Sequence, residues 1–115
     1  MTTRVGDVDL LRNARVFYRD VKPYEAPNDL AELAGPAQGT VTLPRNVYWG
    51  PWPEAHLGIE SDVLKAYEAL LREGRASDQK ALMNRELLVT VWPQLVMPER
   101  VRELWQTRFA ELPRG

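Results

Sequence analysis

The chain contains no cysteine and a single histidine. Without thiols it forms no disulfide, no thiolate metal site and no cysteine nucleophile, which fits a reducing compartment. The histidine, His56, has Glu54 and Glu60 as acidic neighbours along the sequence. Metal sites and catalytic bases need partners that the fold places beside them. We therefore expect His56 to be structural or exposed, and we expect neither a metal nor a cofactor.

Long apolar runs and an excess of either charge are also missing. No apolar stretch approaches the roughly 20 residues of a membrane-spanning helix, and residues 1–9 lack the apolar core of a signal peptide. With 15 basic and 16 acidic side chains the net charge is −1, which disfavours tight, non-specific binding to phosphate backbones. We therefore expect a cytoplasmic protein that does not bind membranes.

The motifs of common catalytic sites are absent as well. The sequence has no glycine-rich dinucleotide fingerprint, no P-loop, no nucleophile elbow and no zinc-protease helix motif. Asp7 and Asp9 are spaced as in some metal-binding nucleotidyltransferase motifs, but no Gly-Ser turn precedes them. Acidic residues at a helix start also favour the helix dipole, which explains this pair more simply. We expect a non-enzymatic protein, with a small enzyme of unknown reaction as the remotest alternative.

Length and patterning predict one domain over residues 1–115. Hydrophobic residues make up 44% and charged residues 27%, so the chain is apolar enough to bury a core. Apolar spacing and helix-boundary residues predict helices over 7–21, 29–34, 61–73, 78–83, 85–92 and 98–112. Residues 40–43 alternate like a strand, and 47–49 are a possible second strand that would pair with them. The predicted fold is mainly α, a small α+β domain: a compact bundle of four to five helices with a short β-hairpin and a Pro/Trp-rich loop.

Polar residues mark the expected helix boundaries. The predicted N-caps are Asn28, Ser61, Ser77 and Asn84, whose side chains accept hydrogen bonds from the first turn. Gly74 stands where a helix commonly ends in the left-handed conformation, and Pro98 suits the first turn of the last helix.

Residues 40–54, TVTLPRNVYWGPWPE, form the most unusual stretch. They hold two tryptophans, one tyrosine and three prolines. Tryptophan combines a large apolar area with a polar handle, so it serves both cores and binding surfaces. We expect Tyr48, Trp49 and Trp52 to close as a lid over helix 61–73, stiffened by the prolines. An exposed recognition edge is the alternative.

Basic side chains gather on one face of the expected first helix. Arg12, Arg15 and Arg19 lie at positions i, i+3 and i+7. Such a face is either solvated or contacts an acidic partner. It is also the best nucleic-acid candidate in the chain, although the neutral net charge counts against that partner.

Helices 61–73, 78–83 and 85–92 could together form a helix-turn-helix. The last of them would be the recognition helix, and it is mostly apolar. It offers Arg85, Glu86 and Thr90 to solvent, which are few groups for reading bases. We therefore expect a core helix here.

The order of several segments resembles a group of small, uncharacterised proteins of high-GC actinobacteria. The shared pattern is YRD, then L-x-G-P-x-x-G-x-V-x-L-P, YE-x-x-L-x-E-G, L-x-x-x-W-P-x-L and W-x-x-x-F-x-E-L. The matching residues are Tyr18-Arg19-Asp20, Leu33, Gly35-Pro36, Gly39, Val41, Leu43-Pro44, Tyr67-Glu68, Leu71, Glu73-Gly74, Leu88, Trp92-Pro93, Leu95, Trp105, Phe109 and Glu111-Leu112. The match spans most of the chain and consists mainly of turn and core residues. It departs at YWGPWPEAH, where the pattern has a simpler segment.

Proteins of this group are often encoded beside nucleotidyltransferase-like toxins of the abortive-infection type, so the resemblance implies an antitoxin or a regulator. It supplies no catalytic residues. The leading prediction is a protein-binding module, antitoxin-like, that covers the acidic active site of such a toxin with Arg12, Arg15, Arg19, Tyr48, Trp49 and Trp52. The alternative is a small DNA-binding transcriptional regulator. Two copies could also pair through an apolar edge along 40–49 or through an exposed Trp105, which would make a homodimer.

Overall fold

The computed structural model describes residues 24–113. The expected helix over 7–21, with Arg12, Arg15 and Arg19, lies outside the described residues. The elements in chain order are η1 (Leu30–Glu32), β2 (Thr40–Thr42), β3 (Glu54–His56), α3 (Glu60–Glu73), α4 (Ala76–Leu82), α5 (Arg85–Val91), η2 (Trp92–Gln94) and α6 (Glu99–Arg108). The described part of the chain is therefore a small α+β fold with four α-helices and a two-stranded antiparallel sheet, as the sequence predicted.

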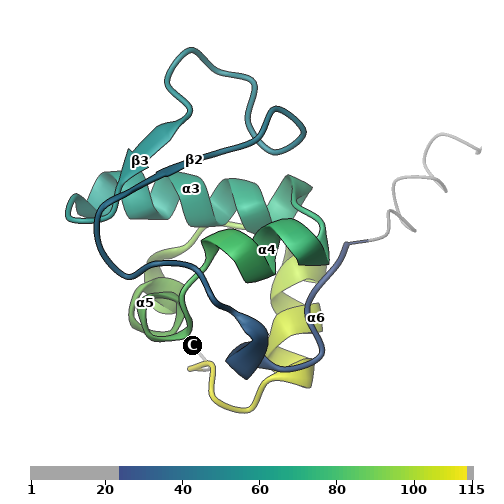
Figure 1. Ribbon diagram of the computed structural model, residues 1–115. Coiled ribbons are helices and arrows are strands. Elements are labelled where there is room, and N and C mark those ends of the chain that lie inside the picture. The colour runs from purple at the N-terminus through teal and green to yellow at the C-terminus, as the bar shows by residue number, and fades with distance from the viewer. Residues whose placement is uncertain (1–23, 114–115) are drawn as a thin grey trace, which may run out of the picture.

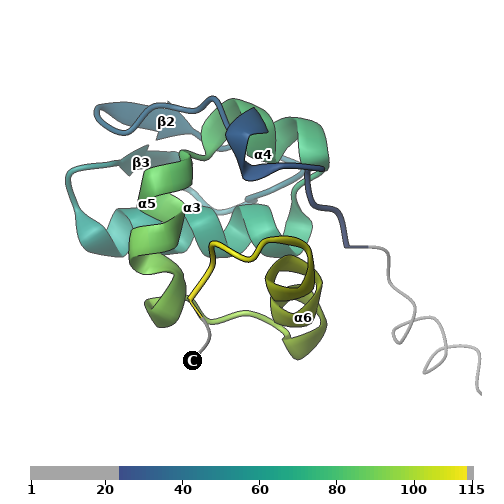
Figure 2. The same ribbon diagram turned by 90° about the horizontal axis from the view of Figure 1, so that it is seen from below.

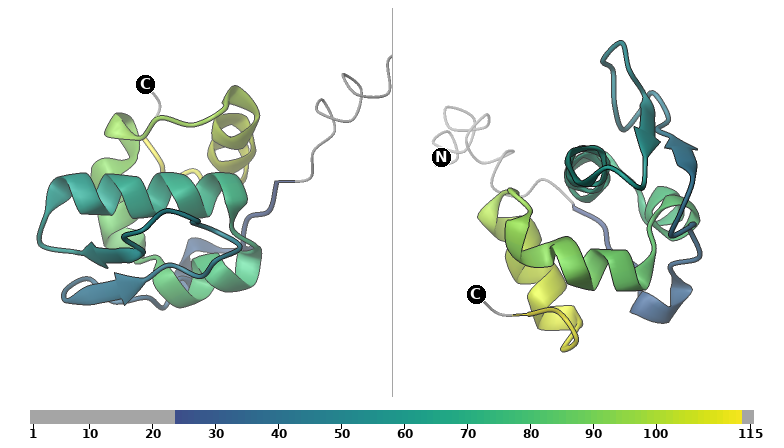
Figure 3. Two further views of the ribbon diagram at one scale, coloured as in Figure 1. Left: turned by 90° about the horizontal axis from the view of Figure 1, so that it is seen from above. Right: turned by 90° about the vertical axis from the view of Figure 1, so that its left-hand side faces the viewer.

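Helix α3 lies at the centre of this arrangement. The hairpin crosses one side of it, and α5 and α6 lie on the opposite side (Figures 1 and 3). The buried side chains of α3 are Val63, Ala66, Tyr67, Ala69, Leu70 and Leu71. They recur at helical spacing, so the helix presents an apolar stripe to the core. Every helix within residues 24–113 is too short or too polar to span a lipid bilayer.

The hairpin differs from the expected one in its second strand. Strand β2 begins at Thr40 as predicted, but it pairs with 54–56 and not with 47–49. The prediction for 47–49 is wrong because the backbone turns there. The N–H groups of Val47 and Tyr48 both donate to the carbonyl oxygen of Pro44, at 2.9 and 3.0 Å. These bonds fold 44–48 back on itself, so the strands are joined by a longer connection.

Helix α5 begins as the sequence predicted. The side-chain oxygen of Asn84 accepts a hydrogen bond from the N–H of Leu87 at 3.0 Å, which satisfies one of the donors at the helix start. The sequence predicts an inward face of Leu87, Leu88, Val91 and Trp92; Leu88, Val91 and Trp92 are buried, and Leu87 is partly buried against the core. Trp92 begins the short helix η2, and Pro93 lies within it.

Three other expected N-caps are wrong, namely those at Asn28, Ser61 and Ser77. Helices α3 and α4 begin at Glu60 and Ala76, so both serines lie inside the first turn. At η1 it is the carboxylate of Asp29 that accepts the N–H of Ala31, at 2.9 Å. Helix η1 begins at Leu30, so Asp29 and not Asn28 stands at the capping position, whereas α3 begins without a side-chain cap.

Gly74 ends α3, but not in the left-handed conformation. Its φ is −80°, which any residue adopts. A Cβ at this position would lie 2.6 Å from the carbonyl oxygen of Leu70, so glycine is needed here for close backbone approach.

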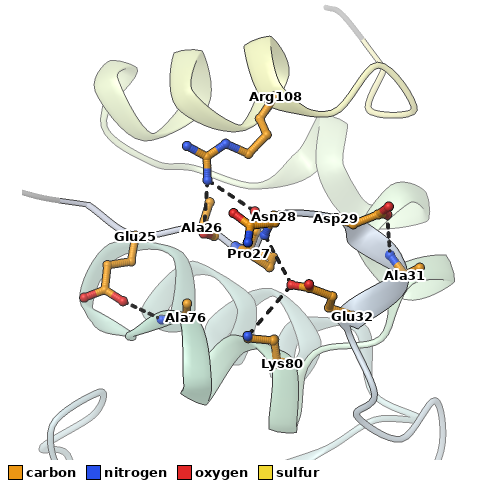
Figure 4. Close-up of polar contacts among 10 residues, drawn as sticks. All are labelled: Glu25, Ala26, Pro27, Asn28, Asp29, Ala31, Glu32, Ala76, Lys80 and Arg108. Carbon is orange, nitrogen blue, oxygen red and sulfur yellow. Dashed lines mark hydrogen bonds and ion pairs between the residues drawn. The ribbon is translucent and has the colours of Figure 1, made fainter.

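Residues 24–32 run between α4 and α6 and are bound to both (Figure 4). The carboxylate of Glu25 accepts the N–H of Ala76 at 2.8 Å, at the start of α4. On the other side, the guanidinium of Arg108 donates to the carbonyl oxygens of Ala26 and Pro27, at 3.2 and 3.3 Å. This segment therefore links two helices that do not follow each other in the chain.

A cluster of aromatic rings closes the core at the C-terminal end. The ring centroids of Trp92 and Trp105 are 6.4 Å apart, and those of Trp105 and Phe109 are 5.3 Å apart. Helix α6 ends at Arg108, four residues before the expected boundary, and Leu112 is buried from the turn that follows. Trp105 is fully buried, so the expectation that it could be exposed and pair two copies is wrong.

Candidate protein-interaction surface

The connection between β2 and β3, residues 43–53, is called the aromatic loop here. It projects away from the helices beyond the hairpin (Figures 1 and 3). Its base is closed by a hydrogen bond from the N–H of Leu43 to the carbonyl oxygen of Pro53, at 2.9 Å. Leu43 and Val47 are buried and hold the first half of the loop against the core.

Lys65, on the outer side of α3, holds the second half. Its ammonium donates to the carbonyl oxygens of Trp52 and Glu54, at 2.8 and 3.1 Å. The same ammonium lies 5.1 Å from the centre of the Tyr48 ring, within the range of a cation–π interaction. One charged group thus fixes both the backbone on one side of the loop and an aromatic ring on the other.

A third anchor joins the loop to α4. The amide of Asn46 donates to the carboxylate of Asp78 at 2.9 Å, and the same carboxylate oxygen accepts the N–H of Arg75 at 2.9 Å. The group that caps the start of α4 therefore also positions the turn of the loop.

Gly50 sits directly beside the Tyr48 ring. A Cβ at residue 50 would overlap the phenol of Tyr48, with the Cε2 atom of that ring at 2.8 Å. The absence of a side chain at Gly50 is what allows the tyrosine to lie across the loop.

The two tryptophans of the loop point outward. Trp49 is 87% exposed and Trp52 is 72% exposed, so the expectation that they form a lid is wrong for both. Val47 already fills the core position under the loop, and Lys65 occupies the place beside Tyr48. The indoles are therefore left in solvent, as the alternative of an exposed edge requires, and recognition by this edge stays a prediction. Large exposed aromatic side chains of this kind typically mark contact sites.

The structure brings three of the six predicted contact residues together. Tyr48, Trp49 and Trp52 share the aromatic loop, whereas Arg12, Arg15 and Arg19 lie outside the described residues. Sequence reasoning missed the anchor Lys65. The available signal was a lysine bordering the apolar stripe of an amphipathic helix, where a charged head can reach neighbouring carbonyl groups.

His56 is exposed on β3. Its Nδ1 atom is 3.1 Å from the hydroxyl oxygen of Thr40, the residue opposite it in the sheet, and its backbone N–H donates to Asp62 at 2.9 Å. Within residues 24–113, no group of three or more histidine, aspartate or glutamate side chains is placed to hold a metal ion.

The candidate recognition helix, α5, turns its apolar side chains inward. Arg85, Glu86 and Thr90 are exposed, as the sequence predicted. The guanidinium of Arg85 forms an ion pair with Glu111 at 3.7 Å, which reduces the positive charge that this helix would offer to a phosphate.

Comparison with protein-family models, with curated proteins and with solved structures finds no match to this chain.

Proposed function

We propose that this chain is a non-enzymatic protein-binding module that contacts its partner through the aromatic loop. The observation that carries this proposal is the exposure of Trp49 and Trp52 on an anchored loop, which is held by main-chain hydrogen bonds at Leu43 and Trp52 and by the side chain of Asn46. Tryptophan is enriched among the residues that dominate binding energy, and its few rotatable bonds limit the entropy lost on contact.

We further propose that the partner is a nucleotidyltransferase-like toxin and that the chain acts as its antitoxin in the cytoplasm. The resemblance to small actinobacterial proteins supports this partner class. The aromatic loop and the basic face of Arg12, Arg15 and Arg19 would cover the acidic active site of the toxin. In this mechanism the bound antitoxin keeps the substrate of the toxin out of the active site. The antitoxin itself makes and breaks no covalent bond.

The test is a capture experiment with two variants of the full chain. The first, Trp49→Ala with Trp52→Ala, removes both indoles. The second, Val96→Ala, removes an apolar side chain that is 73% exposed in the connection between η2 and α6. Each tagged protein is incubated with lysate of the native host, bound proteins are identified by mass spectrometry, and the affinity of the purified partner is measured by calorimetry.

We expect one protein to bind the parent and Val96→Ala, and to bind the double variant at least about 30-fold more weakly, as for loss of a binding hot spot. All three proteins should unfold at the same temperature, because neither indole contributes to the core. A double variant that binds the same partner with parental affinity would contradict the proposal. So would a double variant that fails to fold, because the tryptophans would then be structural.

Two further measurements test the partner class. The toxin assignment predicts that the captured protein transfers nucleotides and that the parent chain inhibits this reaction, whereas the double variant does not. Capture of operator DNA in a strongly salt-dependent complex would instead favour the DNA-binding regulator.

A further inference from the structure

The two edges of the β2–β3 sheet can be compared group by group. Two main-chain hydrogen bonds join the strands at the two ends of the register. The N–H of Leu43 donates to the carbonyl oxygen of Pro53, and the N–H of Leu57 donates to that of Gly39. In an antiparallel pair, hydrogen-bonded residues alternate with residues whose N–H and C=O groups point away from the partner strand. The main-chain N–H and C=O groups that point outward are therefore those of Thr40 and Thr42 on β2 and of Glu54 and His56 on β3.

The outward edge of β3 is covered by α3 and the turn before it. The N–H of His56 donates to the carboxylate of Asp62 at 2.9 Å, and its carbonyl oxygen accepts the N–H of Ile59 at 2.9 Å. The carbonyl oxygen of Glu54 accepts from Lys65 at 3.1 Å. Three of the four outward groups of β3 are thus occupied, so this edge is not free to take another strand.

The outward edge of β2 is open. The outward N–H and C=O groups of Thr40 and Thr42 have no hydrogen-bond partner within residues 24–113, and both residues are exposed. Figures 2 and 3 show β2 as the outermost element on its side, with β3 between it and α3. The strand has no lysine, proline or bulge within 40–42 that would block a further strand, and such unprotected edges are templates for pairing.

We propose that β2 pairs with β2 of a second copy of this chain. The twofold axis passes beside Val41, so Thr40 of each copy exchanges two main-chain hydrogen bonds with Thr42 of the other. Four bonds form, and no outward group of either β2 is left without a partner. The strands run antiparallel, and the two hairpins become one four-stranded sheet.

Side chains and charge fit a second copy. Thr40 and Thr42 lie opposite each other across the axis, and cross-strand threonine pairs are favourable in sheets. Val41 meets Val41 of the other copy, in the closer type of antiparallel pair. The net charge of −1 gives little repulsion between two copies. Because three residues form a small interface, we expect a dimer that dissociates on dilution.

The pairing leaves the aromatic loops free. Each loop follows the C-terminal end of its own β2, and in an antiparallel pair these ends lie at opposite ends of the sheet. The dimer would therefore present two aromatic loops at once. The pairing itself does not depend on the proposed function.

The test combines sedimentation with amide hydrogen exchange on the full chain, in dilute and in concentrated solution. We expect the parent to be monomeric when dilute and dimeric when concentrated. The amides of Thr40 and Thr42 should exchange about tenfold or more slowly once most of the protein is paired, while the amides of Val41 and Ala55 are protected at both concentrations.

Thr42→Pro removes one outward N–H and places a ring where the second strand would lie, which an edge strand tolerates at an outward position. Its matched control is Thr42→Val, which keeps the N–H and the β-branched shape. We expect Thr42→Pro to remain monomeric and Thr42→Val to dimerise like the parent. If Thr42→Pro does not fold, the hydrogen exchange of the Thr40 and Thr42 amides in the parent chain still tests the pairing.

Three results would overturn the proposal. The first is a parent chain that stays monomeric with fast exchange at Thr40 and Thr42 in concentrated solution. The second is protection of both amides in the dilute monomer, which would mean that the chain covers the edge itself. The third is protection that arises only when another protein is added, which would assign the edge to that protein.

Discussion

Replacing Tyr67 by phenylalanine tests the contact that joins the two halves of the helical core. Tyr67 is fully buried in α3, and its phenol oxygen accepts the backbone N–H of Asn84 at 2.8 Å. Asn84 is also the N-cap of α5, so one hydroxyl and one side-chain amide together organise the start of this helix.

Phenylalanine keeps the ring and removes the acceptor. The N–H of Asn84 would then lie in a part-buried place without a partner, and a lost partner of this kind costs about 1–3 kcal/mol. In a domain of this size, a change of 1 kcal/mol moves the midpoint of thermal unfolding by roughly 4–8 °C. Urea and thermal unfolding of Tyr67→Phe at pH 7 measure both quantities. Tyr48→Phe is the matched control, and we expect a change within about 0.5 kcal/mol for it, since its phenol has no hydrogen-bond partner within residues 24–113.

The same substitution changes the dependence of stability on pH. Burial raises the pKa of Tyr67 above the usual 10.0, and the hydrogen bond from Asn84 acts in the opposite direction with a smaller effect. In the unfolded chain this tyrosine ionises from about pH 10, while in the folded chain it stays protonated to higher pH. Its contribution to stability is therefore complete below pH 10 and lost as the pH rises through the folded pKa.

Because Tyr67→Phe lacks this ionisation, the stability difference between parent and variant should narrow above pH 10. A variant as stable as the parent at pH 7 would refute the hydrogen-bond argument. A difference that stays constant from pH 7 to well above pH 10 would refute the argument from burial.

The remaining predictions concern the backbone contacts of the core. Gly35→Ala should destabilise by about 3 kcal/mol in urea unfolding, because its Cβ would overlap the backbone of Leu82 and lie 2.7 Å from the nitrogen of Met83. Gly58→Ala, with no atom within 4 Å of the new Cβ, is the control and should stay within about 0.5 kcal/mol. Gln79→Glu should cost about 3–5 kcal/mol in the same assay, because the fully buried amide now donates to the carbonyl oxygens of Glu25 and Leu70, and a carboxylate there would be unpaired. Gln79→Met, which adds no charge, should cost less, and a larger loss for methionine would contradict the electrostatic argument.

The second half of the fold follows from local patterns. Apolar residues at helical spacing predicted α3 and α5 within one or two residues, and Asn84 was recognised as a cap. These signals depend on residues within one or two helical turns. They predict a helix correctly whenever the packing of the core favours the same helix. The start of α4 was less accurate: the carboxylate of Asp78 accepts the N–H of Arg75, the helix begins at Ala76, and Ser77 lies inside its first turn.

The aromatic loop did not follow from local patterns. Its shape depends on Lys65, which reaches back to the carbonyl oxygen of Trp52, and on Asp78, which binds Asn46 from 32 positions away. Neither pairing has a periodic signature. Composition alone could not decide whether Trp49 and Trp52 form a buried lid or an exposed edge, since tryptophan is common in cores and on binding surfaces. The decisive fact is that Val47 fills the core side of the loop.

The free energy available from the exposed indoles bears on how tightly one loop can bind. A tryptophan buries about 150–250 Å² when covered, so two side chains that are 87% and 72% exposed offer roughly 6–10 kcal/mol at about 25 cal/mol per Å². Association of two proteins costs an estimated 4–15 kcal/mol before any contact is counted. One loop alone therefore supports weak binding at most, even though its anchored backbone reduces the ordering cost. Tight binding needs a second contribution, either from Arg12, Arg15 and Arg19 or from the second loop of a β2-paired dimer, which would raise the affinity for a partner with two sites.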